Sequence, residues 1–301
     1  MGYVKVGRAY YYDPVSGKGL CPKDATLGIE GTSMSPGVKR IASRVGAYRP
    51  FGPGHDDIRE LAGISVTAKE VERISREIGD DAARFFAKES DEALSVPDPA
   101  SPQVPVMYVS MDGTGVPVVK RETVGRKGKG PDGQGKTREV KLGCVFTQTT
   151  VDEKGRPVRD EASTTYTGIV ETASEFSPRI YGEAVRRGIS GALRVVVLGD
   201  GGTWIWNIAD EQFPGAVQII DLYHAREHYW KVARAVFGDD TISMDAWARK
   251  RKKELNGGKP EKVIRAIREL TPASAHSREV CRTEIGYFEN NRGRMKYDEY
   301  R

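Results

Sequence analysis

Two short apolar runs in the second half of the chain constrain the fold more than any other feature. Residues 193–198 and 216–220 are predominantly apolar, and they lead into Asp200 and Asp221. Runs of this length without regular alternation are typical of strands that are buried on both faces of a sheet. We therefore expect two central strands here, each followed by a helix.

The segment before these runs is rich in β-forming residues. An apolar stretch over 104–109 leads to Asp112 and continues over 116–119, and further strands are expected at 139–150 and 164–170. Helices are expected at 176–187, 204–213 and 222–237. Strands of antiparallel character followed by alternating strands and helices predict an α/β fold, with one mixed sheet and flanking helices over 104–237.

The N-terminal third has a helical character instead. We predict helices at 36–48, 55–61 and 68–78, with Gly63 in the turn before the last of them and Thr67 as a capping residue. Helix, glycine-containing turn and helix match a DNA-binding helix-turn-helix, and they equally match an ordinary helical hairpin. Residues 35–95 are therefore predicted to be a helical domain and a candidate DNA-binding domain.

Domain boundaries follow from composition. Residues 1–34 are expected to be irregular, apart from an edge strand at 10–12. The segment 95–103 is rich in proline and serine, cannot continue a helix, and predicts a linker. Residues 238–301 are strongly charged and are predicted to be all helical.

Several classes of protein are disfavoured by the composition. No stretch approaches the roughly 20 apolar residues that span a bilayer, and the first residues lack the apolar core of a signal peptide. The 3 cysteines are far apart, without a Cys-x-x-Cys pair, so neither a disulfide framework nor a zinc ribbon is supported. We therefore expect a cytoplasmic protein without membrane association. The net charge of +5 is weak evidence for a polyanionic partner.

Three carboxylates are the main candidates for chemistry. Asp112 interrupts an apolar strand, while Asp200 and Asp221 follow the two buried runs. A charge at the end of a buried strand is costly unless it is paired or binds a cation, and clustered carboxylates suit Mg²⁺ or Mn²⁺. The alternative is that each aspartate caps a helix or begins a turn.

The histidines that follow Asp221 allow two interpretations. Asp221 and His224 would lie one turn apart on a helix, where His224 could position a phosphate, or where the pair is simply an N-cap with a surface histidine. His224, Glu227 and His228 also match the inverted zinc-peptidase motif H-x-x-E-H, which places both histidines on one helical face. That site needs a third ligand, for which Glu284 and Glu289 are candidates.

Two basic segments are candidate DNA contacts. Between Lys120 and Lys141 there are 8 Lys or Arg and 3 acids, a local charge of 8 − 3 = +5, around a glycine-rich loop. Such a loop beside a carboxylate site suits contact with a phosphate backbone, although it also matches a solvated hairpin tip. The second segment is the run 249–253. The predicted DNA-binding residues are Arg126, Lys127, Lys129, Lys136, Arg138, Arg249, Lys250 and Arg251.

Taken together, four segments resemble the DDE transposases of bacterial insertion sequences, in the branch related to Mutator-type elements. They are Val109-Ser-Met-Asp-Gly-Thr-Gly115, Arg138-Glu-Val-Lys-Leu-Gly143, Leu198-Gly-Asp-Gly-Gly-Thr-Trp-Ile205 and Asp221-Leu-Tyr-His-Ala-Arg-Glu-His-Tyr-Trp230. The resemblance implies an RNase H-like fold. It also implies that Asp112 and Asp200 are catalytic acids that bind Mg²⁺ or Mn²⁺, and that Asp221 and His224 form an auxiliary pair.

The same resemblance implies partners and a reaction. The partners would be DNA, as element terminal repeats and target, and further copies of the chain in a homo-oligomer. Two metal ions would activate water or a 3′-hydroxyl for in-line attack on a phosphodiester and stabilise the leaving oxygen. The location would be the cytoplasm, at the nucleoid.

The sequence also departs from the family pattern. The third acid of the family is a glutamate after an all-helical insertion, which residues 238–301 resemble, but the expected Gly-Ser-Gly-x-x-Glu-like segment does not occur before Arg301. Residues 12–17 stand where such proteins often carry a Cys-x-x-Cys-Gly zinc element. We therefore expect a chain that binds DNA and cuts it poorly, or a non-catalytic DNA-binding remnant.

Overall fold

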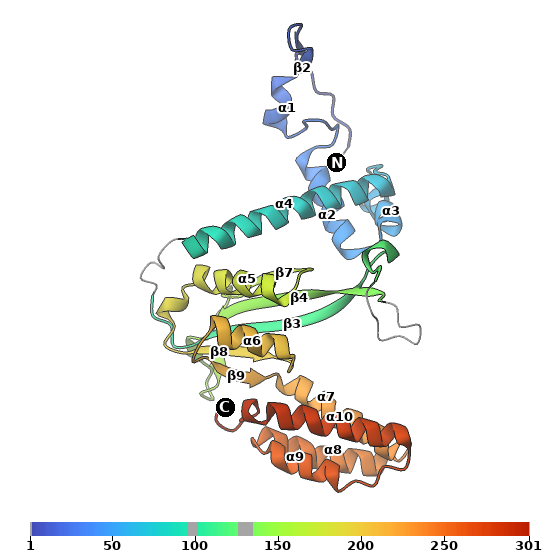
Figure 1. Ribbon diagram of the computed structural model, residues 1–301. Coiled ribbons are helices and arrows are strands. Elements are labelled where there is room, and N and C mark those ends of the chain that lie inside the picture. The colour runs from blue at the N-terminus through green and yellow to red at the C-terminus, as the bar shows by residue number, and fades with distance from the viewer. Residues whose placement is uncertain (1, 96–101, 126–134, 301) are drawn as a thin grey trace. The chain divides into compact units, whose positions relative to one another are not determined.

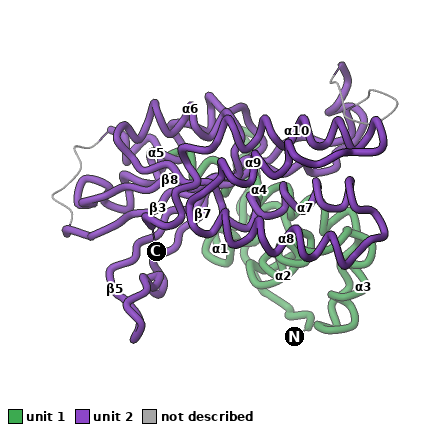
Figure 2. The backbone as a smooth tube through the Cα atoms, turned by 90° about the horizontal axis from the view of Figure 1, so that it is seen from below, with its two compact units in different colours: residues 1–88 green, residues 89–301 purple. Residues whose placement is uncertain are grey.

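The computed structural model describes residues 2–95, 102–125 and 135–300. They form two compact units, Met1–Lys88 and Glu89–Arg301, which Figure 2 distinguishes by colour. The division falls inside a helix rather than in the predicted linker, most of which lies outside the described residues. The residues of that helix from Glu89 onward belong to the second unit, where Glu89 pairs with Arg186.

The first unit begins with a hairpin of β1 (Tyr11–Asp13) and β2 (Lys18–Leu20), followed by α1 (Pro22–Leu27). The expected edge strand at 10–12 corresponds to β1, whereas β2 and α1 were not expected. Asp13 explains the turn, because its carboxylate accepts hydrogen bonds from the backbone nitrogens of Val15 and Ser16. A short aspartate turn of this kind allows two brief strands to pair.

Three helices build the core of the first unit. They are α2 (Pro36–Tyr48), α3 (Phe51–Ala62) and α4 (Ala68–Ser95). Gly63 ends α3 with a φ of 65°, and Thr67 caps α4 together with Glu70. The side chains at the centre of the core are Ala42, Ile58, Val66, Val71 and Ile74. The predicted helix, turn and helix are present, but α4 continues well beyond the predicted end at residue 78.

The second unit contains a mixed five-stranded sheet (Figure 1). Its strands are β3 (Met107–Pro117), β4 (Thr137–Thr147), β7 (Thr165–Ile169), β8 (Val195–Gly199) and β9 (Val217–Ile220). They are arranged in the order β7-β4-β3-β8-β9. The pairs β3–β4 and β4–β7 are antiparallel, whereas β3–β8 and β8–β9 are parallel. The predicted α/β fold with a mixed sheet is confirmed.

A second hairpin, of β5 (Thr150–Val151) and β6 (Pro157–Val158), was not predicted. Short 3₁₀ helices are present at η1 (Lys120–Glu122), η2 (Ile189–Gly191) and η3 (Arg292–Arg294).

The part of the core next to the sheet is covered by two helices, α5 (Ala173–Arg186) and α6 (Thr203–Gln212), and the same apolar cluster continues into the C-terminal helices. Strand β3 alternates along its length. Met107, Val109 and Met111 are buried toward this core, while the intervening residues are more exposed. Asp112 continues the more exposed set. This alternation places Asp112 on the face of β3 that does not pack into the core.

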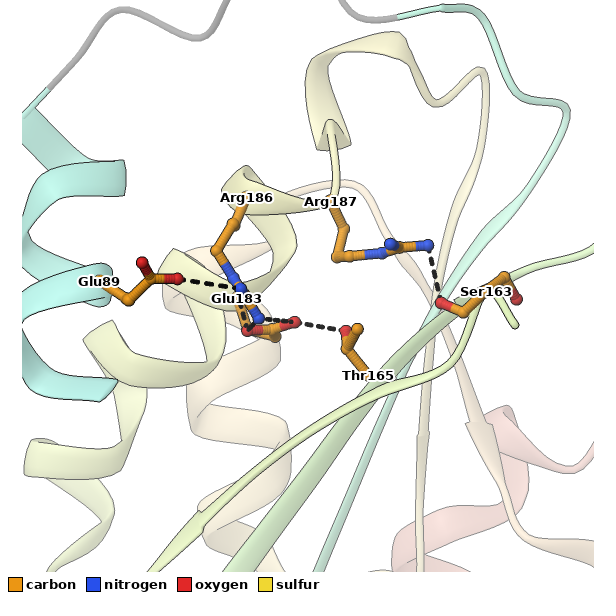
Figure 3. A network of polar contacts seen from close by, with 6 residues as sticks. All are labelled: Glu89, Ser163, Thr165, Glu183, Arg186 and Arg187. Carbon is orange, nitrogen blue, oxygen red and sulfur yellow. Dashed lines mark hydrogen bonds and ion pairs between the residues drawn. The ribbon is translucent and has the colours of Figure 1, made fainter. Parts of the chain in front are cut away.

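A polar network joins α5 to its neighbours (Figure 3). Glu183 of α5 is buried and accepts hydrogen bonds from Arg186, one turn later, and from Thr165 of β7. Arg186 also pairs with Glu89 near the end of α4, at 3.1 Å. Arg187 donates to the carbonyl of Ser163 at 2.7 Å.

Residues beyond the sheet are helical, as predicted. Four helices pack together: α7 (Leu222–Phe237), α8 (Thr241–Asn256), α9 (Pro260–Arg268) and α10 (Ala275–Asn291). Helix α7 begins directly after β9, so these helices adjoin the edge of the sheet (Figure 1). Among the described residues, no helix is both long and apolar enough to cross a membrane.

Candidate active site at the ends of the central strands

Three aspartates form one row across the neighbouring strands β3, β8 and β9. In the parallel register, Ser110 of β3 lies opposite Leu198 of β8. Asp112 and Asp200 each come two residues after this pair. Asp221 directly follows Ile220, the last residue of β9. Ile220 pairs with Gly199 of β8, and Gly199 directly precedes Asp200. The register therefore brings all three sequence-predicted acids to the same end of three adjacent strands.

Each of these carboxylates has one oxygen held by a backbone amide. Gly113 donates to Asp112 at 2.7 Å, Gly202 donates to Asp200 at 2.8 Å, and His224 donates to Asp221 at 2.7 Å. Asp221 is thus the N-cap of α7, as the alternative interpretation expected. Within the described residues, the second oxygen of each side chain has no hydrogen-bond partner. The amides fix the carboxylates and leave one oxygen of each available.

In the part of the chain that the structure describes, no positive side chain neutralises the row. Among residues 2–95, 102–125 and 135–300, no Lys, Arg or His forms an ion pair with Asp112, Asp200 or Asp221. The nearby Lys141 is buried, but its ammonium group donates to Glu139 at 2.6 Å and lies 4.5 Å from the centre of the Trp204 ring. Unpaired carboxylates at strand ends repel one another, so a cation at this position would be stabilised.

The row opens into a pocket of about 270 Å³. The backbone at its edge is tightly packed: Gly201 has a φ of 111°, and a Cβ there would come within 2.8 Å of the Tyr287 ring. Glycine is therefore required beside Asp200 for conformation and for space. The pocket is lined by Ser110, Met111, Asp112, Leu198, Gly199, Asp200, Asp221, Tyr223, His224 and Glu227.

Two histidines of α7 lie next to each other, and one of them, His224, lines the pocket. The Nε2 atoms of His224 and His228 are 3.2 Å apart, and Nδ1 of His228 contacts the carboxylate of Glu284 on α10. Glu289 pairs with Arg268 at the surface. Glu284 contacts Nδ1 rather than Nε2 of His228 and Glu289 pairs with Arg268, so neither is placed as the third ligand of a zinc-peptidase site. The geometry gives that interpretation no support within the described residues.

Two tyrosines that the sequence did not single out hold the strand ends. The hydroxyl of Tyr287 donates to the carbonyl of Asp200, and that of Tyr297 donates to the carbonyl of Ile220, both at 3.0 Å. Burial raises the pKa of both phenols well above the usual range, and the Asp221 carboxylate adds to both shifts. Both side chains therefore act as neutral donors. A helical spacing alone cannot reveal which face of α10 meets the sheet.

The donor chemistry of the row fits a hard divalent cation, because it offers unpaired carboxylate oxygens. Its geometry is incomplete: within the described residues, no three His, Cys, Asp or Glu side chains are arranged to hold a metal ion. Glu284 cannot complete the row while it contacts His228. Asp112 and Asp200 are thus suited to hold a cation, but within the described residues Asp221 is not arranged with them as a third ligand.

The predicted DNA-binding residues fall into three groups. Arg126, Lys127 and Lys129 lie outside the described residues. Arg138 lies on β4 and is 3.8 Å from Glu122, and Lys136 is exposed just before β4. The third group lies on α8.

On α8 the prediction is partly wrong. Arg249 and Lys250 are exposed, but Arg251 is 4% exposed, donates to Glu254 at 2.7 Å and packs on Trp247. A guanidinium that is buried and paired in this way is not available to a phosphate. The basic surface of α8 instead includes Lys252 and Lys253, which are exposed. Helical periodicity explains the difference, because a five-residue basic run covers more than one face of a helix.

Neither the models of known protein families nor the curated proteins give a match to this chain.

Proposed function

We propose that this chain is the core of a metal-dependent DNA-cutting and DNA-joining enzyme of the transposase type, built on an RNase H-like sheet. The row of three uncompensated aspartates on adjacent strands carries the proposal. It is supported by the strand arrangement, in which an antiparallel meander of β3, β4 and β7 is extended by the parallel strands β8 and β9. It is also supported by the motif resemblance around each aspartate.

The proposed cofactor is Mg²⁺ or Mn²⁺, held by Asp112 and Asp200. When bound, the cation would neutralise phosphate charge and activate the attacking oxygen. The backbone amides of Gly113 and Gly202 hold one oxygen of each carboxylate and so present the other toward the pocket. This preorganisation is the contribution that the protein makes to such catalysis.

The other residues of the pocket have proposed roles of position and charge. Asp221 begins α7 and thereby sets the place of His224, which lines the same pocket. Because Nε2 of His224 faces His228, a donated hydrogen bond to a phosphate oxygen of the DNA would come from Nδ1 of the doubly protonated imidazole. Gly201 keeps the backbone beside Asp200 free of a side chain, which allows the tight packing against Tyr287.

DNA is the proposed substrate and partner, as element ends and as target, bound in the cytoplasm at the nucleoid by a homo-oligomer. Lys136 directly precedes β4, and Arg138 lies near the start of that strand. Strand β4 pairs with β3, which carries Asp112. Arg249, Lys250, Lys252 and Lys253 form a second exposed basic set on α8. Contacts from such residues to phosphates supply affinity without sequence information.

The test is a cleavage and strand-transfer assay with Mg²⁺ or Mn²⁺ on DNA that carries the ends of the parent element. The chain would be compared with Asp200→Ala and with the matched control Asp210→Ala, an exposed aspartate on α6. We expect weak activity, because no third metal ligand is arranged beside Asp112 and Asp200 in the described residues, and we expect Asp200→Ala to abolish it. Equal activity in all three proteins would contradict the proposed site. DNA binding without any cleavage would favour a non-catalytic remnant.

A further inference from the structure

A chain of side-chain contacts leads from the interior of the helical region to the candidate site. Glu284 of α10 contacts Nδ1 of His228, and Nε2 of His228 lies 3.2 Å from Nε2 of His224. His224 lines the pocket that contains the three aspartates. The two α7 histidines are one helical turn apart, whereas Glu284 is 56 residues away from His228 in the sequence.

The chemistry of the groups fixes the direction of the hydrogen bonds. A carboxylate accepts, so Nδ1 of His228 must be the nitrogen that carries the proton when it faces Glu284. The neutral His228 ring then has a lone pair on Nε2, and this atom accepts from Nε2–H of His224. One buried carboxylate therefore determines the tautomer of neutral His228, and His228 in turn holds Nε2 of His224. The Nδ1 atom of His224 lies 3.5 Å from the carboxylate of Glu227, which is 66% exposed, so the buried contact with His228 is the closer of its two partners.

The surroundings leave His228 little freedom to choose another arrangement. Its side chain is 12% exposed and that of Glu284 is 8% exposed, compared with 34% for His224. The Tyr287 ring stacks on His228 with a centroid separation of 3.5 Å and an interplanar angle of 10°. Because Tyr287 also donates to the carbonyl of Asp200, the same helix α10 contacts both His228 and the acidic row.

We propose that Glu284 and His228 are positioning residues that orient His224 toward the pocket, in the way that an outer carboxylate orients a functional histidine. The role of His224 toward a bound phosphate rests on the proposed function. The series of contacts from Glu284 through His228 to His224, here called the orienting chain, does not. Glu284 thus has a structural partner of its own, which distinguishes it from a metal ligand.

The test is the tautomeric state of each histidine, measured by two-bond ¹H–¹⁵N NMR on the full chain labelled with ¹⁵N-histidine. There are 4 histidines, so single histidine-to-glutamine variants assign the spectrum. At about pH 8, where imidazoles are ordinarily neutral, we expect His228 to show the Nδ1–H pattern and His224 the Nε2–H pattern.

Three variants probe the cause. Glu284→Leu should remove the Nδ1–H pattern of His228, whereas Glu284→Gln should retain it, because the amide oxygen still accepts. Glu289→Leu, on the same helix and paired with Arg268, should leave all four histidines unchanged. An Nε2–H pattern for His228 in the unmodified chain would overturn the proposal. So would an unchanged pattern in a folded Glu284→Leu variant, with folding checked by circular dichroism.

This readout needs neither DNA nor metal. If the tautomers are as expected but no DNA is cut, the orienting chain stands and the proposed function fails. If DNA is cut with Asp200 dependence but His228 shows the other tautomer, the orienting chain fails and the proposed function stands.

Discussion

Carboxylates occupy two very different environments in the second unit. Glu183 is buried, and its oxygens accept hydrogen bonds from Arg186 and Thr165 (Figure 3). Asp112 and Asp200 each accept one backbone hydrogen bond, and no positive side chain in the described residues pairs with them. The first environment is complete within the protein, so its role is to hold β7 and α5 together. The second is incomplete, which is the property expected of a site that binds a cation.

The largest expected effect is a loss of DNA cleavage when a carboxylate of the acidic row is removed. Asp112→Asn should reduce cleavage by about 10³-fold, a typical loss when one preorganised electrostatic group is removed. Its stability should change by no more than about 0.5 kcal/mol, because the amide oxygen can still accept from Gly113. The measurement is single-turnover cleavage together with urea unfolding. If Asp112→Asn lost both cleavage and several kcal/mol of unfolding free energy, Asp112 would be a structural carboxylate like Glu183.

The reverse effect is expected for Glu183→Leu. Removal of this acid leaves Arg186 and Thr165 without their partner, so the free energy of unfolding should fall by about 2–3 kcal/mol. Glu289→Leu is the control, because its pair with Arg268 is exposed and should contribute at most about 0.5 kcal/mol. Urea unfolding of both variants measures the difference. Equal stability of the two would show that the buried network does not hold the unit together.

A smaller effect concerns pH and the tyrosines that pin the strand ends. Burial raises the pKa of Tyr287 and Tyr297, so the folded chain keeps these protons at a pH where the unfolded chain loses them. Their contribution to stability is therefore full below about pH 10 and declines as the pH rises above that value. Each phenol should contribute at most about 1.4 kcal/mol per pH unit to the decline of the free energy of unfolding with pH.

Single Tyr287→Phe and Tyr297→Phe variants should each flatten the decline of stability between about pH 10 and pH 11. Tyr3→Phe, in an exposed position, serves as the control. A slope that is the same in all four proteins would mean that the hydroxyls are not buried as neutral donors beside the acidic row.

The smallest expected effect concerns the basic surface of α8. Each of its side chains should make a small, additive contribution to DNA affinity, in contrast to the large effect of each aspartate on cleavage. Replacing Lys250 or Lys252 with serine should lower the slope of log K against log salt by about 0.9 for each phosphate that the variant no longer neutralises. Lys296→Ser is the control, since Lys296 pairs with Glu299. Filter binding at several salt concentrations measures the slope. An unchanged slope in the α8 variants would remove α8 from the DNA interface.

The sequence predicted the sheet better than it predicted the surroundings of the site. Apolar runs identify β8 and β9 because burial on both faces excludes polar residues. The three aspartates could be named in advance because each stands beside such a run. The predicted end of α4 at residue 78 was wrong, since Gly79 is tolerated inside a helix that is supported by ion pairs such as Arg73–Glu77.

Contacts distant in sequence could not be predicted in the same way. Tyr287 meets Asp200 across 87 positions, and Glu284 meets His228 across 56. No local pattern distinguishes these side chains from others on α10, because the packing of that helix decides which face meets the sheet. For the same reason, the run 249–253 did not reveal that Arg251 is buried against Trp247.

The most direct test of the account is binding of Mn²⁺ to the acidic row, measured by electron paramagnetic resonance on the full chain without DNA. We would compare the unmodified chain with the double variant Asp112→Asn, Asp200→Asn and with Glu183→Gln. The account predicts bound Mn²⁺ in the unmodified chain and in Glu183→Gln, and its loss in the double variant. Equal binding in all three proteins, or no binding in any of them, would contradict the claim that the unpaired carboxylates form a cation site.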